Sequence, residues 1–155
     1  MLTPLQQSQY GAALFIIPKK EGTVRFITNY RRLNQQLVRK RYPLTRIGET
    51  LQQLEVFQYG TALDINIKYY TISLSTASQD MTTIGTEFCK FSYNCLLVGM
   101  CASGDIFQAK VDNLLRDIEG VETYIGDILV LSKNSFENRI GHVKIIYLAD
   151  CALQA

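Results

Sequence analysis

The sequence has 155 residues, of which 47% are hydrophobic and 19% charged, and its formal net charge is +2. This length and apolar content suit one domain with its own core, and they exclude an intrinsically disordered chain or one that folds only around a metal or disulfide staple. No apolar run reaches the roughly 18 residues that cross a bilayer, and the N-terminus lacks the pattern of a secretory signal, so we expect a protein of the cytoplasm or nucleus that is not secreted.

A basic β-hairpin is the first predicted element. Residues 12–18 and 23–29 are rich in apolar and β-branched side chains, which favours two strands. The connecting KKEG carries two lysines, and Gly22 supplies the conformation of a tight turn. Further along, Pro43 ends any regular run.

The middle of the chain combines one short helix with several strands. Ile47, Leu51 and Leu54 fall at helical spacing, which predicts an amphipathic helix. The strands predicted beyond it are a buried strand at 61–65, an alternating strand at 69–75 and a hairpin formed by 83–88 and 91–98.

A longer helix is predicted over residues 104–118. Ser103 can accept a hydrogen bond from the first free amides, and Asp105 suits the positive end of the helix dipole. One face of this helix is apolar and is expected to pack in the core; it carries Phe107, Val111, Leu114, Leu115 and Ile118.

A second hairpin and a last helix complete the predicted elements. The apolar stretches VETYI and ILVLS are separated by Gly126 and Asp127, which favours a β-hairpin. The last helix starts near Asn134 or Ser135, contains Gly141 and presents Phe136, Ile140, Val143 and Tyr147. Strands with interspersed helices predict an α+β fold.

The charges are divided unevenly along the chain. Residues 1–50 hold nine Lys and Arg against two Asp and Glu, 9 − 2 = +7, and residues 51–155 hold seven against twelve, 7 − 12 = −5. Such polarity suits a protein that binds a polyanion with one lobe and gathers cations with the other. The alternative is a basic face that is simply solvated.

The cysteines and the single histidine do not predict a zinc site. Cys89, Cys95, Cys101 and Cys151 form no Cys-x-x-Cys pair, and His142 has no second imidazole beside it. Without a secretory signal, we expect reduced thiols that pack as small apolar side chains.

Two acidic residues stand where the local pattern tolerates acids poorly. Asp64 ends an apolar strand, and Asp127 lies in the predicted hairpin turn. Carboxylates brought together in this way can hold Mg²⁺, and two such ions would activate a 3′-hydroxyl and stabilise the leaving oxygens in phosphoryl transfer. Asp127 also has a purely structural interpretation as a turn residue.

Five motifs in order carry a resemblance to a known family. They are SQYGAALFIIPKKEGTVRFITNYRRLN, RYPLTRI, TALDINIKYYTI, LLVGMCASGDIFQAKVDNLL and TYIGDILVLSK. From about Ser8 to Asp150 the chain resembles, as a degenerate and truncated copy, the reverse transcriptase of gypsy-type long-terminal-repeat retrotransposon Pol polyproteins. The resemblance implies a fingers-like region over about 8–58 and a palm-like region over about 59–150, with an antiparallel palm sheet packed against helices and without the thumb and RNase H segments.

The resemblance also implies roles for single residues. Asp64 matches the first metal-binding aspartate, and two Mg²⁺ ions are expected as cofactors, with Asp127 as a further ligand. The nucleic-acid partners are an RNA or DNA template-primer, joined by an incoming dNTP. Nucleotide-binding roles fall on Lys19, Lys20, Arg25, Tyr69 and Gly99, and a template-side role on Gln108. The lysines can instead be plain solvent-facing residues, Tyr69 core packing and Gln108 a solvent-facing side chain.

The catalytic hairpin departs from the family pattern. Where the family has Tyr, a variable residue and two aspartates, this chain has Tyr124, Ile125, Gly126 and Asp127. Losing one metal ligand is expected to cost on the order of 10²- to 10³-fold in rate, about 3–4 kcal/mol. The family also has an aspartate at Asn29 and prolines at Leu97 and Gly104.

Three hypotheses follow from these residues. The leading one is a fragment of an RNA-directed DNA polymerase that is inactive because Gly126 replaces the second catalytic aspartate. The second is a nonenzymatic nucleic-acid-binding remnant, and the third is a relic without a stable fold.

Overall fold

The computed structural model describes residues 2–43, 57–65 and 68–133, together with Phe136, Ile140, Gly141, Val143 and Tyr147. The chain divides into two compact units. Unit 1 comprises Met1–Arg39 and Ile72–Ser103, and unit 2 comprises Lys40–Thr71 and Gly104–Ala155. Each unit combines a largely or wholly antiparallel β-sheet with helical segments, which confirms the α+β prediction. The division into fingers-like and palm-like regions near residue 58 stays a prediction.

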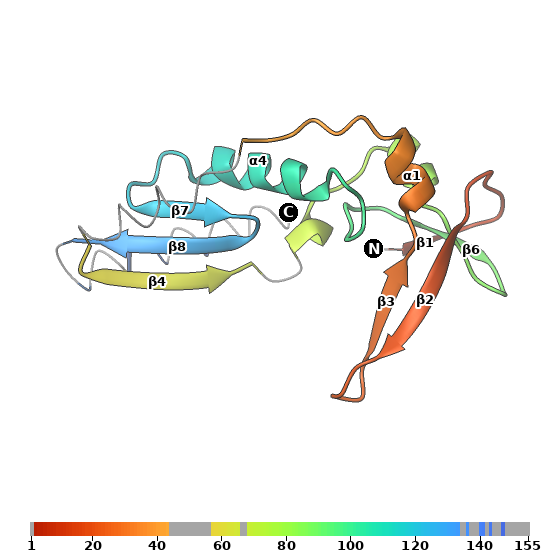
Figure 1. The fold of residues 1–155 in the computed structure, drawn as a ribbon, viewed down its shortest axis with the longest axis horizontal. Helices are drawn as coiled ribbons and strands as arrows, with labels where there is room; N and C mark the ends of the chain where they lie inside the picture. Colours follow the sequence, from red (N-terminus) through yellow and green to blue (C-terminus); the bar gives the residue numbers. More distant parts are fainter. Residues whose placement is uncertain are drawn as a thin grey trace. The chain divides into compact units, whose positions relative to one another are not determined.

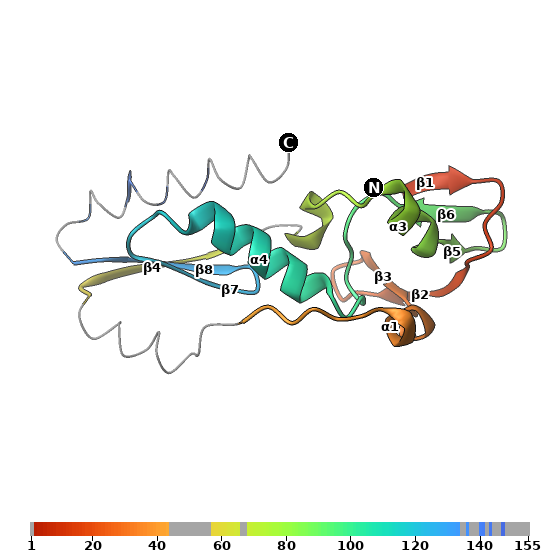
Figure 2. The ribbon, with the colours of Figure 1, turned by 90° about the horizontal axis from the view of Figure 1, so that it is seen from above.

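Unit 1 is built on a five-stranded sheet (Figures 1 and 2). Its strand order is β1-β6-β5-β2-β3, and all neighbours are antiparallel except the parallel pair β2 and β5. The strands are β1 Leu2–Leu5, β2 Ala12–Pro18, β3 Val24–Thr28, β5 Ile84–Gly85 and β6 Lys90–Tyr93.

Both hairpins predicted in this unit are confirmed. β2 pairs with β3 from Leu14↔Thr28 to Pro18↔Val24, and Gly22 adopts φ +75° in the connecting turn. That backbone conformation is free of steric cost only for glycine, which explains the residue at this place. The β5–β6 hairpin is present with strands shorter than the sequence predicted.

Two short helices of unit 1 were not predicted. α1 spans Arg31–Gln36 and α3 spans Thr76–Met81. Neither contains a buried residue, so the apolar periodicity that reveals a helix in a sequence is absent from both. The Asn29 side chain accepts a hydrogen bond from the Arg31 N–H at 3.3 Å where α1 begins.

The core of unit 1 gathers side chains from separate segments. Tyr30, Ile84, Leu96 and Leu97 are buried, and the Tyr30 hydroxyl donates to the carbonyl oxygen of Thr82 at 2.8 Å. This bond satisfies a phenol that would otherwise be costly to bury.

Unit 2 is built on a three-stranded antiparallel sheet in the order β4-β8-β7. The strands are β4 Tyr59–Asp64, β7 Val121–Tyr124 and β8 Asp127–Ser132, so the predicted second hairpin is confirmed. β8 is the central strand, and its Ile128, Val130 and Leu131 are buried. Helix α4, Ser103–Leu115, runs beside β7 in both ribbon views (Figures 1 and 2).

Two strand predictions in the middle of the chain need correction. The strand predicted at 61–65 is present as β4, which spans Tyr59–Asp64 and does not include Ile65. It is an edge strand with only exposed and half-buried residues, rather than a buried strand. Residues 69–75 do not form one strand: Lys68–Thr71 is a 3-10 helix, η1, and Ser73 makes an isolated bridge to Cys95. The Thr71 hydroxyl donates to the Lys68 carbonyl oxygen at 2.8 Å and closes η1, a local bond that competes with an extended strand.

The predicted long helix is confirmed, but α4 ends at Leu115 rather than at residue 118, so Ile118 lies outside it. Two further differences concern its surface and its start. Phe107, Val111 and Leu115 are buried, whereas Leu114 is 39% exposed. Ser103 does not cap the helix by accepting, because its hydroxyl donates to the Leu97 carbonyl oxygen at 2.6 Å. Asp105 lies in the first turn as predicted.

Some predictions lie wholly or partly outside the described residues. The helix based on Ile47, Leu51 and Leu54 lies outside them. Phe136, Ile140, Gly141, Val143 and Tyr147 are helical, in agreement with the predicted last helix. Cys89, Cys95 and Cys101 are free thiols, and Cys151 is not described. Among the described residues, no helix is both long and apolar enough to cross a membrane.

Candidate active site

The sheet of unit 2 places the two predicted catalytic carboxylates side by side. Asp64, the last residue of β4, is the register partner of Asp127, the first residue of β8. Their side chains are 72% and 71% exposed, so both carboxylates face solvent. Asp127 therefore belongs to a strand, and the prediction that it lies in the turn is wrong.

The turn between β7 and β8 consists of Ile125 and Gly126. Both have positive φ, 43° and 91°, as the common two-residue hairpin turn requires. Positive φ is rare for a β-branched residue such as isoleucine, whereas Gly126 adopts it without cost. The Ile65 N–H donates to the Gly126 carbonyl oxygen at 2.9 Å, which fixes the turn against the end of β4.

Lys68 binds both carboxylates. Its Nζ lies 2.8 Å from Oδ1 of Asp64 and 3.4 Å from Oδ1 of Asp127. Its stem lies over Gly126, since a Cβ atom built on that glycine would be 2.6 Å from Cδ and 2.8 Å from Cε of Lys68. Lys68 was not among the site residues predicted from the sequence, although its i,i+4 spacing from Asp64 was a usable signal.

These contacts shift the pKa values of Asp64 and Lys68 in opposite directions. The hydrogen bond from Lys68 holds the pKa of the Asp64 carboxyl below its ordinary value, with the positive charge of Lys68 adding to the effect. The same bond raises the pKa of Lys68 above its ordinary value, against the effect of desolvation. Both groups are therefore charged at neutral pH.

Gln108 supports the turn from helix α4. Its side chain is buried, donates from Nε2 to Asp112 at 2.6 Å and to the Thr123 hydroxyl at 2.8 Å, and accepts at Oε1 from the Ile125 N–H at 2.5 Å. The Thr123 hydroxyl also donates to Asp112. The alternative that Gln108 faces solvent is thus wrong, and Asp112 and Thr123 join it as residues that the sequence analysis did not find.

Tyr69 packs on the same helix. Its ring meets that of Phe107 edge to face, with the centroids 5.5 Å apart and the planes at 77°. Such pairs are favourable beyond the area they bury. This contact is the kind expected if Tyr69 serves in core packing. Its role in selecting nucleotides stays a prediction.

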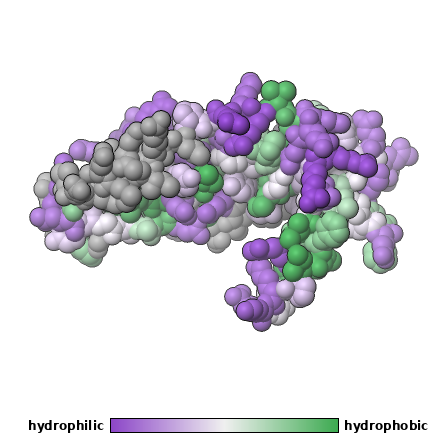
Figure 3. Space-filling model, viewed as in Figure 1, coloured by the Kyte–Doolittle hydropathy of each residue, from purple (hydrophilic) through white to green (hydrophobic). Residues whose placement is uncertain are grey.

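The remaining predicted residues belong to unit 1. Lys19, Lys20 and Arg25 are exposed on the β2–β3 hairpin, and none forms an ion pair within the described part of the chain. On the face drawn in Figure 3, hydrophilic residues occupy the hairpin tip and hydrophobic ones its body. The exposed apolar side chains of the hairpin are Phe15, Ile16, Ile17, Val24, Phe26 and Ile27.

Gly99 lines a cavity of about 350 Å³ in unit 1, together with Phe15, Ile27 and Arg31. It adopts φ +105°, and its carbonyl oxygen accepts from Nδ2 of Asn34 at 2.8 Å. A side chain at this position would be strained and would approach the Thr28 carbonyl oxygen, at 3.6 Å from a built Cβ.

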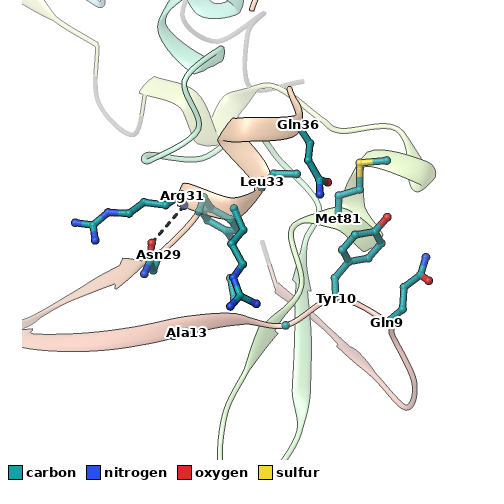
Figure 4. A pocket seen from close by; sticks show the side chains of 12 residues that line it. Gln9, Tyr10, Ala13, Asn29, Arg31, Leu33, Gln36 and Met81 are labelled. Atoms are coloured by element: carbon teal, nitrogen blue, oxygen red, sulfur yellow. Dashed lines mark hydrogen bonds between the residues drawn. The ribbon is translucent and has the colours of Figure 1, made fainter. Parts of the chain in front are cut away.

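A larger pocket of about 500 Å³ was not found from the sequence. Figure 4 shows it between the segment before β2, the start of α1 and Met81. Arg31 and Arg32 line it together with Gln9 and Gln36, and its volume is in the range of small-molecule sites, about 300–1,000 Å³. None of the predicted site residues lines this pocket.

Residues 17–150 match the family model described as reverse transcriptase (RNA-dependent DNA polymerase). The chain belongs to this family. The resemblance inferred from the five motifs is thereby confirmed.

Retrotransposon polyproteins are among its relatives. The domain is 30% identical over 134 residues to the retrovirus-related Pol polyprotein from transposon opus of Drosophila melanogaster, covering 82% of this chain and 13% of the relative. It is 28% identical over 132 residues to that from transposon 412 of the same organism, covering 80% and 11%. The chain thus spans only a small part of the curated relatives that it matches.

Solved structures of foamy virus enzymes share its fold. One is the foamy viral protease-reverse transcriptase in complex with an RNA/DNA hybrid, with a TM-score of 0.80 and 20% identity over 96% of this chain and 20% of that one. Another is the native prototype foamy virus protease-reverse transcriptase, with a TM-score of 0.78 and 23% identity over the same shares. These neighbours confirm the fold of the domain.

Proposed function

We propose that this chain is a template-primer-binding fragment of a retrotransposon reverse transcriptase whose own site no longer catalyses nucleotidyl transfer. The observation that carries the proposal is the β7–β8 turn. Gly126 occupies the position where the resemblance places a metal-binding aspartate, and the stem of Lys68 lies over it.

The chemistry explains why this position matters. Transfer of a nucleotidyl group by this family uses two divalent ions that activate the attacking hydroxyl and stabilise the leaving oxygens. Glycine supplies no ligand, and the two carboxylates nearby already share one ammonium group. We expect a loss of at least about 10²- to 10³-fold in rate, the cost of one removed electrostatic partner.

Binding of nucleic acid is supported by features that do not depend on Gly126. The exposed Lys19, Lys20 and Arg25 form a basic hairpin suited to phosphates. Gly99 and Arg31 line a cavity next to that hairpin, within the same unit. The structural neighbours include complexes with double-stranded DNA and with an RNA/DNA hybrid, which favours a template-primer as the partner here.

Primer extension and binding should be measured on the same preparation. We expect the 155-residue chain to bind a labelled RNA/DNA hybrid in fluorescence anisotropy, more weakly as salt rises, and to extend no primer on an RNA template with Mg²⁺ or Mn²⁺. Metal-dependent synthesis by the unaltered chain would overturn the inactivity. Absence of salt-sensitive binding together with noncooperative melting would favour a relic without a stable fold.

A further inference from the structure

The Asp64–Asp127 pair already has a cation supplied by the chain itself. Nζ of Lys68 lies within ion-pair distance of both carboxylates, at 2.8 and 3.4 Å. The Lys68 side chain is only 30% exposed, whereas the two aspartates are more than 70% exposed. The lysine is thus partly sheltered by the elements around it, and the carboxylates form the outer side of the cluster.

The space that the Lys68 stem occupies exists because residue 126 is glycine. A Cβ atom at Gly126 would lie 2.6 Å from Cδ, 2.8 Å from Cε and 3.2 Å from Cγ of Lys68. Separations below 3 Å are not tolerated between carbon atoms, so any side chain at 126 would push the lysine stem away. Gly126 and Lys68 are therefore sterically complementary.

The charges in the cluster do not fit a pair of divalent ions. The two carboxylates together carry a charge of −2, and Lys68 contributes +1. The cluster therefore offers one net negative charge to an incoming cation. A divalent ion at the carboxylates would lie a few ångströms from the ammonium group, whose like charge repels it. No third His, Cys, Asp or Glu joins the pair in the described ranges.

We propose that Lys68 is a built-in counter-ion that takes the place of a divalent cation at the Asp64–Asp127 pair and keeps such cations out. The inference rests on the function proposed above and concerns the same carboxylates. Replacing Gly126 by aspartate does not simply add a ligand, because the new side chain must also displace Lys68, and the displaced ammonium stays tethered nearby.

The test measures metal binding and not synthesis. Mn²⁺ binding to the full chain is followed by the loss of the free-ion signal in electron paramagnetic resonance, for the unaltered chain, for Lys68→Met and for Lys110→Met. Lys110 is an exposed lysine of α4, so the control removes the same charge from the same unit without touching the cluster. We expect Lys68→Met to tighten Mn²⁺ binding about fivefold to tenfold and Lys110→Met to leave it within about twofold. Adding Asp64→Asn to Lys68→Met should abolish the gain.

Equal affinities of the unaltered chain and Lys68→Met would overturn the proposal, as would an equal gain in Lys110→Met. A second measurement needs no variant. The ¹⁵Nζ signal of Lys68 in the unaltered chain should stay unchanged when Mg²⁺ is added at millimolar concentrations, and a saturable shift of that signal would contradict the counter-ion role even if Lys68→Met failed to fold. Absent primer extension combined with tight Mn²⁺ binding by the unaltered chain would overturn this inference alone. Metal-dependent extension would overturn the proposed function.

Discussion

The side-chain oxygen of Gln108 accepts a hydrogen bond of 2.5 Å from the backbone N–H of Ile125. Ile125 has a positive φ, which is unfavourable for a β-branched residue, and it precedes Gly126 in the turn that carries the candidate site. The buried amide of Gln108 therefore holds a strained turn from outside the hairpin.

Replacing Gln108 by leucine should destabilise the domain. The change leaves the Ile125 N–H without its acceptor and removes one of the donors to the Asp112 carboxylate, at a cost of about 1–3 kcal/mol in the free energy of unfolding. Urea denaturation followed by circular dichroism measures the loss. Asn113→Ala, on the exposed side of the same helix, is the control and should change stability by no more than about 0.5 kcal/mol. Equal losses in the two variants would contradict the bracing role of Gln108.

Truncation of Phe107 to alanine should lower the free energy of unfolding more than the same change at any other residue of α4. It is fully buried and meets the ring of Tyr69 edge to face, so Phe107→Ala creates a cavity and should lower the free energy of unfolding by about 3–5 kcal/mol. Its neighbour Ile106 is 44% exposed, and Ile106→Ala should cost far less in the same denaturation experiment. A smaller loss for Phe107→Ala than for Ile106→Ala would show that the buried face of the helix is assigned wrongly.

The pKa of Asp64 should depend on Lys68. Because the pKa is lowered in the folded chain, the ion pair stabilises the fold above the ordinary pKa of an aspartate, and this contribution is lost as pH falls through the lowered value. Lys68→Met should raise the pKa of Asp64 toward its ordinary value in an NMR titration of the carboxyl carbons.

Glu122 provides an internal comparison in the same titration. Burial, aided by the charge of Asp112, raises its pKa, so Glu122 contributes stability at low pH that is lost as pH rises through the raised value. Lys68→Met should leave the Glu122 pKa unchanged. If both carboxyls shifted together, the variant would have altered the fold of the sheet rather than one ion pair.

Gly126→Ala should destabilise the turn for two separable reasons. Alanine is strained at φ +91°, and its Cβ displaces the flexible Lys68 stem and with it the ammonium group from the two aspartates, so we expect a loss of about 1–2 kcal/mol. Gly22→Ala shares the positive φ but has open space around the added carbon, and Gly11→Ala has the open space without the positive φ. Thermal or urea unfolding should therefore rank Gly126→Ala as the most costly, then Gly22→Ala, then Gly11→Ala. Any other order would argue against the steric role of Lys68.

The hairpin lysines should govern the salt dependence of nucleic-acid binding. Replacing Lys19 and Lys20 by glutamine removes two phosphate contacts, which should lower the slope of log affinity against log salt by about 1.8 for a duplex. Anisotropy titrations at several salt concentrations measure this slope. The double variant Lys110→Gln with Arg116→Gln removes the same charge from unit 2 and should leave the slope nearly unchanged. The same reduction in both would indicate that net charge, and not the hairpin, drives binding.

Local patterns in the sequence determined the hairpins and the long helix. The β2–β3 and β7–β8 hairpins depend on short apolar strands and on glycines that adopt positive φ, and α4 depends on apolar residues at helical spacing. Each of these signals lies within a few residues of the element that it specifies. The ordered motifs also indicated the family, and with it the pairing of Asp64 with Asp127.

Only the tertiary structure decided what surrounds those carboxylates. Residues 69–75 resemble a strand in the sequence, yet their first half forms η1, which begins with Lys68 and brings its ammonium group to both aspartates. Gln108 likewise looked like one polar residue on a helix, and its burial against Ile125 depends on how α4 packs beside β7. A sequence pattern records the periodicity of one segment, whereas these contacts join segments up to 59 residues apart, and only the packing of the folded chain brings them together.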